Sequence, residues 1–183
     1  MDLQPTLIGR LLTLRPLAGQ DFPTLFSVAS DPRIWEIHPV PDRYKEDVFR
    51  VFFDSGIASG GALVVIDNAT GEIIGSSRYY DLDETVVTVK TVKIGYTFLA
   101  RRCWGGGFNT EMKGLMLDHA FRTVETVRFE VGETNFRSRR DMEKLGATPA
   151  GTTVVDGKPY VVYAIWRDKT PLLGKGGVDA TSR

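Results

Sequence analysis

A glycine-rich turn at residues 105–107 constrains this chain more than any other feature, because it separates a strand-like run from a helix-like run. Residues 92–99 before it are rich in β-branched and aromatic side chains, which is typical of a strand. The residues after it place Met112 and Met116 at helical spacing. Glycine lets a backbone approach a ligand closely, and the first N–H groups of a helix have no partner within it. The turn therefore predicts a binding site for a phosphorylated cofactor.

Three kinds of phosphate-binding loop compete for this assignment. The sequence holds no Walker A string, since the Gly-Lys-Gly at 174–176 lacks both the earlier glycine and the hydroxyl residue after the lysine. A dinucleotide fingerprint would need a third glycine where Thr110 stands. The third pattern, Arg-x-x-Gly-x-Gly, is met by Arg102, Gly105 and Gly107.

This third pattern resembles the loop with which the GNAT superfamily of N-acetyltransferases binds the pyrophosphate of acetyl-CoA. Other segments match in the same order and resemble the ribosomal-protein alanine N-acetyltransferase branch: 12–17 with Asp21, 70–75, 94–96, and Asn135-x-x-Ser138-x-Arg140 followed by 143–146. The resemblance covers roughly residues 10–167. The chain departs from the family at Ala147, where phenylalanine is usual, and at its glycine triplet, which makes a more flexible loop. These departures leave the acceptor substrate open.

Composition narrows the class of protein. The 183 residues suit one domain with a full core, and a formal net charge of zero argues against bulk nucleic-acid binding. One cysteine allows no internal disulfide, the first residues lack a signal segment, and no apolar run approaches the ~20 residues of a membrane span. Two distant histidines give no metal motif. We expect a cytoplasmic protein without membrane, nucleic-acid or metal partners, with a domain over 1–167 and a flexible tail over 168–183.

Periodicity and turn signals predict seven strands interleaved with four helices. The strands are expected over 11–17, 62–67, 72–80, 85–99, 126–131, 148–155 and 160–166, and the helices over 21–30, 44–58, 108–122 and 135–145. Gly95 predicts a bulge in the long fourth strand, and Asp156-Gly157 predicts a tight hairpin. Asp21 and Asn135 are the expected caps of the first and last helices. The apolar side of the second helix is expected to hold Val48, Val51, Phe52 and Ser55.

These elements indicate an α/β (α+β) fold, a single domain with a mixed, mostly antiparallel seven-stranded sheet and helices on both faces. The GNAT resemblance implies that strands four and five splay apart and that the pantetheine arm of acetyl-CoA enters the gap. The backbone of 96–99 would pair with the pantetheine amides, since an edge strand has unpaired N–H and C=O groups. A backbone N–H near Thr97 or Phe98 would stabilise the oxyanion.

The resemblance also implies roles for single residues. Asn135 would hydrogen-bond the pantetheine, and Ser138, one helical turn later, would lie near the sulfur as a general acid. Arg102, together with Arg101 or Arg139, would balance the pyrophosphate charge. The basic residues 137–140 would contact a 3′-phosphate or form a solvated helix face. The residues expected at the cofactor are Thr97, Phe98, Leu99, Arg102, Trp104, Gly105, Gly106, Gly107, Phe108, Asn109, Thr110, Asn135 and Arg139.

The general base is left open. Glu130 shares a strand face with Arg128 and could act directly or through water if that face lines the cleft. Glu133, Glu36 and His38 are alternatives, and His38 has the suitable unperturbed pKa. Tyr96 would either orient the substrate or pack in the core.

The leading hypothesis is an acetyl-CoA-dependent N-acetyltransferase that acts directly on a primary amine, a protein N-terminal α-amine or a small-molecule amine, in a ternary complex. A site without a strong base suits an α-amine, because about a tenth of such amines are neutral at pH 7. The alternative is a non-catalytic acyl-CoA-binding module that acts through a protein partner. A nucleic-acid role for 137–140 is disfavoured by the zero net charge. The resemblance further suggests a homodimer.

Overall fold

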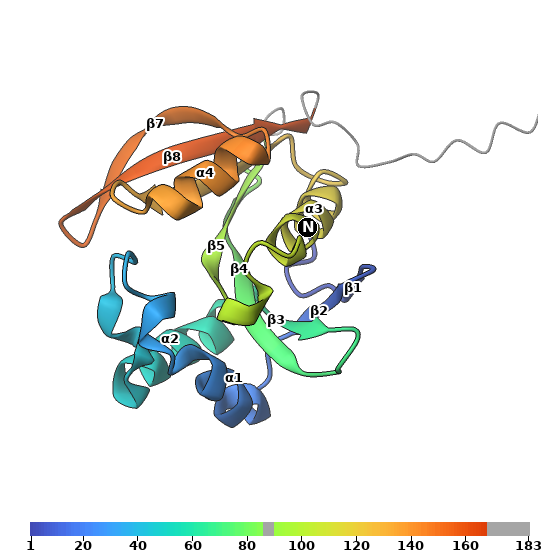
Figure 1. Cartoon of the computed structure of the whole chain (residues 1–183). Helices are drawn as coiled ribbons and strands as arrows, with labels where there is room; N and C mark the ends of the chain where they lie inside the picture. The colour runs from blue at the N-terminus through green and yellow to red at the C-terminus, as the bar shows by residue number, and fades with distance from the viewer. Residues whose placement is uncertain (86–89, 168–183) are drawn as a thin grey trace, which may run out of the picture.

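An eight-stranded sheet runs through the computed structural model, which describes residues 1–85 and 90–167 (Figure 1). Its order is β1-β2-β3-β4-β5-β6-β8-β7, and every neighbouring pair is antiparallel except the parallel pair β5 and β6. The predicted mixed, mostly antiparallel sheet is confirmed. The strands are β1 (Leu7–Ile8), β2 (Leu12–Pro16), β3 (Ala62–Asp67), β4 (Ile73–Asp83), β5 (Thr91–Leu99), β6 (Thr126–Gly132), β7 (Thr148–Val155) and β8 (Lys158–Trp166). The sequence missed β1, whose two residues are too few to show a period.

Four α-helices cover both faces of the sheet. They are α1 (Phe22–Ala29), α2 (Glu46–Ser59), α3 (Phe108–Ala120) and α4 (Phe136–Lys144). Successive strand residues point to opposite faces. Val65 of β3 therefore packs in one core with Met112 and Met116 of α3, whereas its neighbour Val64 packs in a second core with α1 and α2. Figure 1 shows α1 and α2 together, away from α3.

The buried face of α2 corrects one prediction. Val51 is 70% exposed, and the helix buries Phe49, Phe52, Phe53 and Gly56 instead. Both candidate faces have helical spacing and share Phe52. The face with three phenylalanines removes more apolar surface from water, which decides the orientation.

Strand β5 carries the bulge that Gly95 predicted. Ser76 pairs with Phe98, and Arg78 pairs with Gly95, so β5 has one residue more than β4 between these two pairs. Tyr96 lies in the bulge with φ of +53°, a conformation that is uncommon for an aromatic residue. The chain thus accepts local strain at one point of β5.

Strands β5 and β6 separate along their length. They pair only over 91–93 and 126–128, whereas β5 continues to Leu99 and β6 to Gly132. Beyond Lys93, the edge of β5 that faces β6 therefore has no strand partner in the described structure. The splayed gap expected between the fourth and fifth predicted strands is confirmed.

Local signals at turns and caps are borne out with one exception. Asn135 caps α4 by accepting a hydrogen bond from the Ser138 N–H at 3.1 Å. Asp156 and Gly157 have φ of 49° and 74°, as a two-residue hairpin turn requires. In the described structure Asp21 does not cap α1 with its side chain, because its carboxylate accepts from the Ala18 N–H and pairs with Arg15 at 2.7 Å.

Some predictions cannot be placed. The expected tail at 168–183, and residues 86–89 of the expected fourth strand, lie outside the described residues. Within 1–85 and 90–167, no helix is both long and apolar enough to span a bilayer.

Candidate functional site

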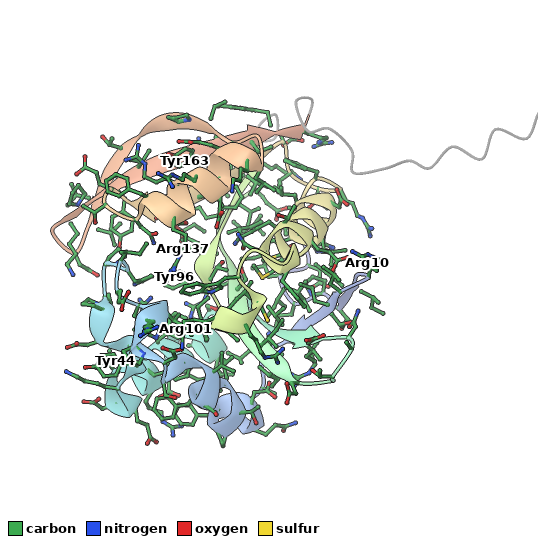
Figure 2. All side chains as sticks on the ribbon, in the orientation of Figure 1. Arg10, Tyr44, Tyr96, Arg101, Arg137 and Tyr163 are labelled. Atoms are coloured by element: carbon green, nitrogen blue, oxygen red, sulfur yellow. The ribbon has the colours of Figure 1, made fainter. Side chains whose placement is uncertain are left out.

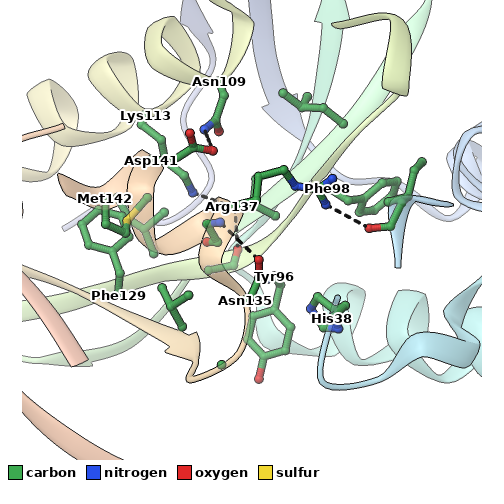
Figure 3. A pocket seen from close by; sticks show the side chains of 18 of the residues that line it. His38, Tyr96, Phe98, Asn109, Lys113, Phe129, Asn135, Arg137, Asp141 and Met142 are labelled. Atoms are coloured by element: carbon green, nitrogen blue, oxygen red, sulfur yellow. Dashed lines mark hydrogen bonds between the residues drawn. The ribbon is translucent and has the colours of Figure 1, made fainter. Parts of the chain in front are cut away.

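A cavity of about 470 Å³ lies in the gap between β5 and β6, and we call it the central cavity (Figure 3). Its walls come from β5, β6, the turn before α3, α3 itself, α4 and the loop at 34–39. Gly106, Phe108, Arg102 and Arg139 are not among its lining residues. The sequence-predicted residues that line it are His38, Tyr96, Thr97, Phe98, Leu99, Trp104, Gly105, Gly107, Asn109, Thr110, Glu130, Asn135, Arg137 and Ser138.

The glycine turn opens onto the start of α3. Gly105 has φ of +73°, and Gly107, the residue before the helix, has φ of +85°, conformations that glycine adopts without strain. The first N–H groups of a helix lack intrahelical partners, and within the described residues no capping side chain accepts from those of α3. A Cβ at Gly105 would meet no atom within 4 Å, which leaves that side of the turn open. These free donors and the positive end of the helix dipole suit an anion.

Trp104 connects this turn to two neighbouring segments. Its indole N–H donates to the Leu99 carbonyl at 3.0 Å. The guanidinium of Arg137 lies 4.0 Å from the centre of its ring, and Arg137 also donates to the Ile34 carbonyl at 3.4 Å. The turn is therefore fixed to the end of β5 and, through Arg137, to α4. Figure 2 labels Arg137 beside Tyr96 among the side chains of the whole molecule.

Two arginines expected near the phosphates are engaged elsewhere. Arg102 pairs with Asp67 at 3.2 Å and with Glu72 at 2.7 Å. Arg101 pairs with Asp31. These three ion pairs join the short helix at Arg101–Cys103 to segments far away in the sequence, and neither arginine lines the central cavity.

A buried lysine at the cavity wall was missed by the sequence reasoning. Lys113 is 4% exposed, and its ammonium donates to Thr97 Oγ1 at 2.6 Å and to Ser77 Oγ at 3.3 Å. Figure 3 shows its side chain extending from α3 beside Asp141. Burial lowers the pKa of Lys113 to about 7, because the charged form loses hydration, and the charge of Asp141 only partly opposes this. The sequence did hold a signal, since Lys113 lies three residues before the buried Met116 on the same helix face.

Asp141 was also missed, and it connects α4 to α3. Its carboxylate accepts a hydrogen bond from the Asn109 amide at 3.1 Å. Burial raises the pKa of Asp141, while nearby cations and this hydrogen bond oppose the rise. The central cavity therefore contains two titratable groups, Lys113 and Asp141, whose pKa values burial moves toward neutrality, a property common at functional sites.

The residues at the start of α4 cap the helix and also leave one hydrogen-bonding group without a partner in the described structure. Asn135 and Ser138 line the central cavity, and the cap bond uses the Ser138 N–H rather than its hydroxyl. In the described part of the chain, that hydroxyl has no hydrogen-bond partner. Arg139 points elsewhere and donates to the Tyr163 hydroxyl at 3.2 Å and to the Glu133 carbonyl at 3.1 Å.

Of the candidate bases, Glu130 is the carboxylate that lines the cavity. One of its oxygens is 2.6 Å from the Lys93 ammonium, and the other accepts from the Tyr80 hydroxyl at 3.4 Å. Glu133 and Glu36 are not among the lining residues. Phe129 and Val131 of the opposite strand face also line the cavity, whereas Arg128 does not, so the alternation of the strand does not by itself select Glu130.

His38 lines the cavity but is poorly suited as a base. Burial, followed by the positive charge of Arg43, lowers the pKa of His38 to about 3. Its Nδ1 accepts a hydrogen bond from the Val40 N–H at 3.1 Å. The ring is neutral near pH 7, and a group with so low a pKa has little affinity for an amine proton.

The family model of the GNAT acetyltransferase domain matches residues 11–148. The chain belongs to the GNAT acetyltransferase family. Comparison with curated protein sequences gives no match.

Solved structures agree with this GNAT assignment. A candidate acetyltransferase from T. thermophilus is 26% identical with a TM-score of 0.71, over 90% of each chain. A GCN5-related N-acetyltransferase from Brucella melitensis is 21% identical with a TM-score of 0.75, over 91% of this chain and 80% of that one. Mycobacterium smegmatis RimJ, in complex with CoA-disulfide, is 20% identical with a TM-score of 0.68, over 91% and 88%. The ribosomal-protein branch, the cytoplasmic location and the homodimer stay predictions.

The residues of this GNAT domain fit the acetyl-CoA that the family uses. The uncapped start of α3 supplies N–H donors for phosphate oxygens, and the open side of Gly105 leaves room for them. The unpaired edge of β5 supplies backbone groups for amides. Among the described residues, no group of three or more His, Cys, Asp or Glu is arranged to hold a metal ion.

Proposed function

We propose that this GNAT protein transfers an acetyl group from acetyl-CoA directly to a primary amine in a ternary complex. The observation that carries the proposal is the unpaired edge of β5 along the central cavity. Backbone groups of 96–99 would pair with the pantetheine amides as a neighbouring strand does. The start of α3, at the same cavity, would hold the pyrophosphate. The acceptor is a protein N-terminal α-amine or a small-molecule amine.

The remaining cofactor contacts come from the turn and from α4. The backbone of 104–110 would surround the phosphates, and the Asn135 amide would hydrogen-bond the pantetheine while it caps α4. Arg102 and Arg139 would reach the phosphates only by leaving their partners. The donors at the helix start therefore bear most of the phosphate binding in this proposal.

The cavity residues supply the chemistry around the reacting thioester. A backbone N–H of Thr97 or Phe98 would donate to the carbonyl oxygen as negative charge develops there, and such a donor contributes about 3 kcal/mol. As the amine nitrogen bonds to the carbonyl carbon, the C–S bond breaks and its electron pair leaves with the sulfur. The Ser138 hydroxyl would give this sulfur a proton, and Glu130 would take the amine proton, directly or through water, after which solvent would return a proton to Ser138 and accept the one held by Glu130. Tyr96 would orient the amine.

When protonated, below its pKa of about 7, Lys113 adds a positive charge beside this path. Its ammonium is bonded to the hydroxyl of Thr97, the residue whose N–H is a candidate oxyanion donor. In the described structure no carboxylate forms an ion pair with Lys113, so its charge is not neutralised locally. A preorganised cation stabilises a state in which negative charge develops more than the neutral ground state. We therefore propose Lys113 as an electrostatic contributor to acetyl transfer.

Cofactor binding is tested by calorimetry with acetyl-CoA. Wild-type protein should bind at micromolar concentrations, and Gly107→Val should lose most of this affinity, because a β-branched residue is strained at φ of +85° and blocks the backbone approach. Gly19→Val is the matched control, since Gly19 does not line the central cavity and its Cβ would meet nothing within 4 Å. Equal affinity in Gly107→Val would remove the turn from the cofactor site.

Catalysis is tested by release of free thiol from acetyl-CoA with a panel of amines. Release that depends on the amine would support direct transfer. Binding of acetyl-CoA without release for any amine would instead favour the non-catalytic acyl-CoA-binding module. Failure to bind acyl-CoA at high micromolar concentrations would remove both functions.

A further inference from the structure

Four cationic side chains without an ion-pair partner in the described structure lie close to His38 or Tyr96. The four cations are Arg43, Arg78, Arg137 and Lys158. The charges of Arg43, Lys158 and Arg137 lower the pKa of His38, and the charge of Arg78 lowers the pKa of Arg43. In residues 1–85 and 90–167, none of the four forms an ion pair with a carboxylate. By contrast, the guanidinium of Arg15 forms an ion pair with Asp21 at 2.7 Å.

Arg43 is held over aromatic rings with its charge unpaired. Its guanidinium carbon is 4.6 Å from the centre of the Phe52 ring and 5.6 Å from that of Trp35. One of its nitrogens is 3.2 Å from Nε2 of His38. Burial lowers the pKa of Arg43 to about 10, which reflects the cost of keeping a cation there without a counter-ion.

Arg78 of β4 is still more buried, at 5% exposure. Its guanidinium carbon lies 4.1 Å from the centre of the Tyr96 ring, and Nη2 donates to the Ser55 hydroxyl at 3.2 Å and to the Phe52 carbonyl at 3.3 Å. Its Nε has no hydrogen-bond partner in the described residues. A buried charged donor without a partner is costly, and an anion nearby would offset that cost.

Arg43 lines a second hollow, which has a volume of about 510 Å³. Its lining includes Arg43, Phe52, Ser55 and Tyr96, and Arg78 contacts two of these residues, Ser55 and Tyr96. Tyr96 lines this hollow and the central cavity alike, so the two meet at the bulge of β5. Asp47 also lines the hollow; it is exposed and is not paired with Arg43 in the described structure.

We propose that the acceptor amine carries an oxyanion, a carboxylate or a phosphate, which binds in the hollow between Arg43 and Tyr96. The amine end would extend past Tyr96 to β5, a placement that rests on the proposed acetyl transfer. Guanidinium groups bind carboxylate and phosphate oxygens with paired, charge-assisted hydrogen bonds. The aromatic rings fix the arginines in place before the ligand arrives, so little side-chain entropy is lost on binding.

Paired amines that differ only in the anion provide the test. Alanine is compared with alaninamide, and O-phosphoethanolamine with ethanolamine, each titrated by calorimetry into CoA-saturated protein and then assayed for thiol release. At least one anionic member should bind more tightly than its neutral partner. Arg43→Met should weaken that binding about tenfold or more, the effect of losing a charge-assisted hydrogen bond, and should leave the neutral partner unchanged.

Two further variants separate charge from packing. Arg43→Lys should keep part of the anion preference, because it keeps the charge. Arg50→Met is the matched control, since Arg50 likewise lies over a phenylalanine ring, that of Phe22, but is not among the lining residues of the hollow. Circular dichroism confirms that each variant folds.

The outcomes distinguish the subsite from the proposed function. The pair that shows the preference identifies the anion as carboxylate or phosphate. Equal binding of charged and neutral members, a preference that survives Arg43→Met, or no binding of either anionic member overturns the subsite. Anion binding without thiol release would support the subsite and refute acetyl transfer. Acetyl transfer to neutral amines alone would support acetyl transfer and refute the subsite.

Discussion

The ammonium of Lys113 lies 2.6 Å from the hydroxyl of Thr97, and this hydrogen bond joins α3 to the bulged part of β5. Ser77 of β4 completes the group, with its hydroxyl 2.8 Å from that of Thr97 and 3.3 Å from the ammonium. Three elements at the central cavity therefore meet at one buried cation. Both partners of the cation are neutral hydroxyls, so its protonation costs free energy that a carboxylate would have offset.

The stability of the protein should depend on pH through Lys113. The pKa of Lys113 falls from 10.5 to about 7 on folding, so between these values the unfolded chain binds a proton that the folded protein does not. The free energy of unfolding should therefore rise with pH from about 7 to 10.5, by up to about 1.4 kcal/mol per unit. Urea unfolding of wild type and Lys113→Met at pH 7 and 9 measures this, and a difference between the two proteins that does not change with pH would contradict it.

Lys113→Met should also slow turnover. Methionine keeps much of the buried volume but removes the cation, so we expect kcat at pH 7 to fall about tenfold to hundredfold while the Kd for acetyl-CoA stays within a few-fold. Steady-state kinetics and calorimetry give the two values. A loss of acetyl-CoA affinity with unchanged kcat would make Lys113 a binding residue rather than a contributor to the reaction.

His38 should not titrate in the physiological range. Its pKa of about 3 follows from burial and from the charge of Arg43, so its NMR signals should stay constant from pH 5 to 8. The chain has two histidines, and the variant His119→Gln assigns the signals. The activity profile of His38→Gln should then show the same inflections as the wild type. A His38 signal that shifts near pH 6.5 would disprove the buried neutral state.

The sequence predicted features that depend on a few neighbouring residues. The glycine turn, the Asn135 cap and the Asp156-Gly157 hairpin each follow from local backbone chemistry, and each is present. Features that depend on distant partners were missed. Arg102 meets Asp67 from a strand 35 residues earlier, and Lys113 meets Ser77 from 36 residues earlier. Such pairings require the strand order, which the residues near each arginine or lysine do not encode.

The close approach of β4 and β5 should depend on Gly75. A Cβ at this position would lie 2.1 Å from the Phe98 carbonyl oxygen, a backbone atom that can move only with the strand. Gly75→Ala should lower the free energy of unfolding by about 1–3 kcal/mol and weaken acetyl-CoA binding, because the edge at 96–99 shifts. Gly19→Ala is the control, since its Cβ meets nothing within 4 Å. Thermal unfolding and calorimetry measure both effects, and equal melting temperatures for the two variants would contradict the prediction.

Substitutions at the start of α4 should separate capping from chemistry. Asn135→Ala removes the side-chain oxygen that accepts the Ser138 N–H, so it should cost about 1 kcal/mol of stability. Ser138→Ala keeps that N–H and removes only a hydroxyl without a partner in the described structure, so stability should stay within about 0.5 kcal/mol. If the hydroxyl protonates the departing sulfur, Ser138→Ala should still lower kcat about tenfold to hundredfold with little change in acetyl-CoA affinity. A variant as active as the wild type would show that Ser138 serves the cap alone, and the proton would then have to come from another group on the cavity wall.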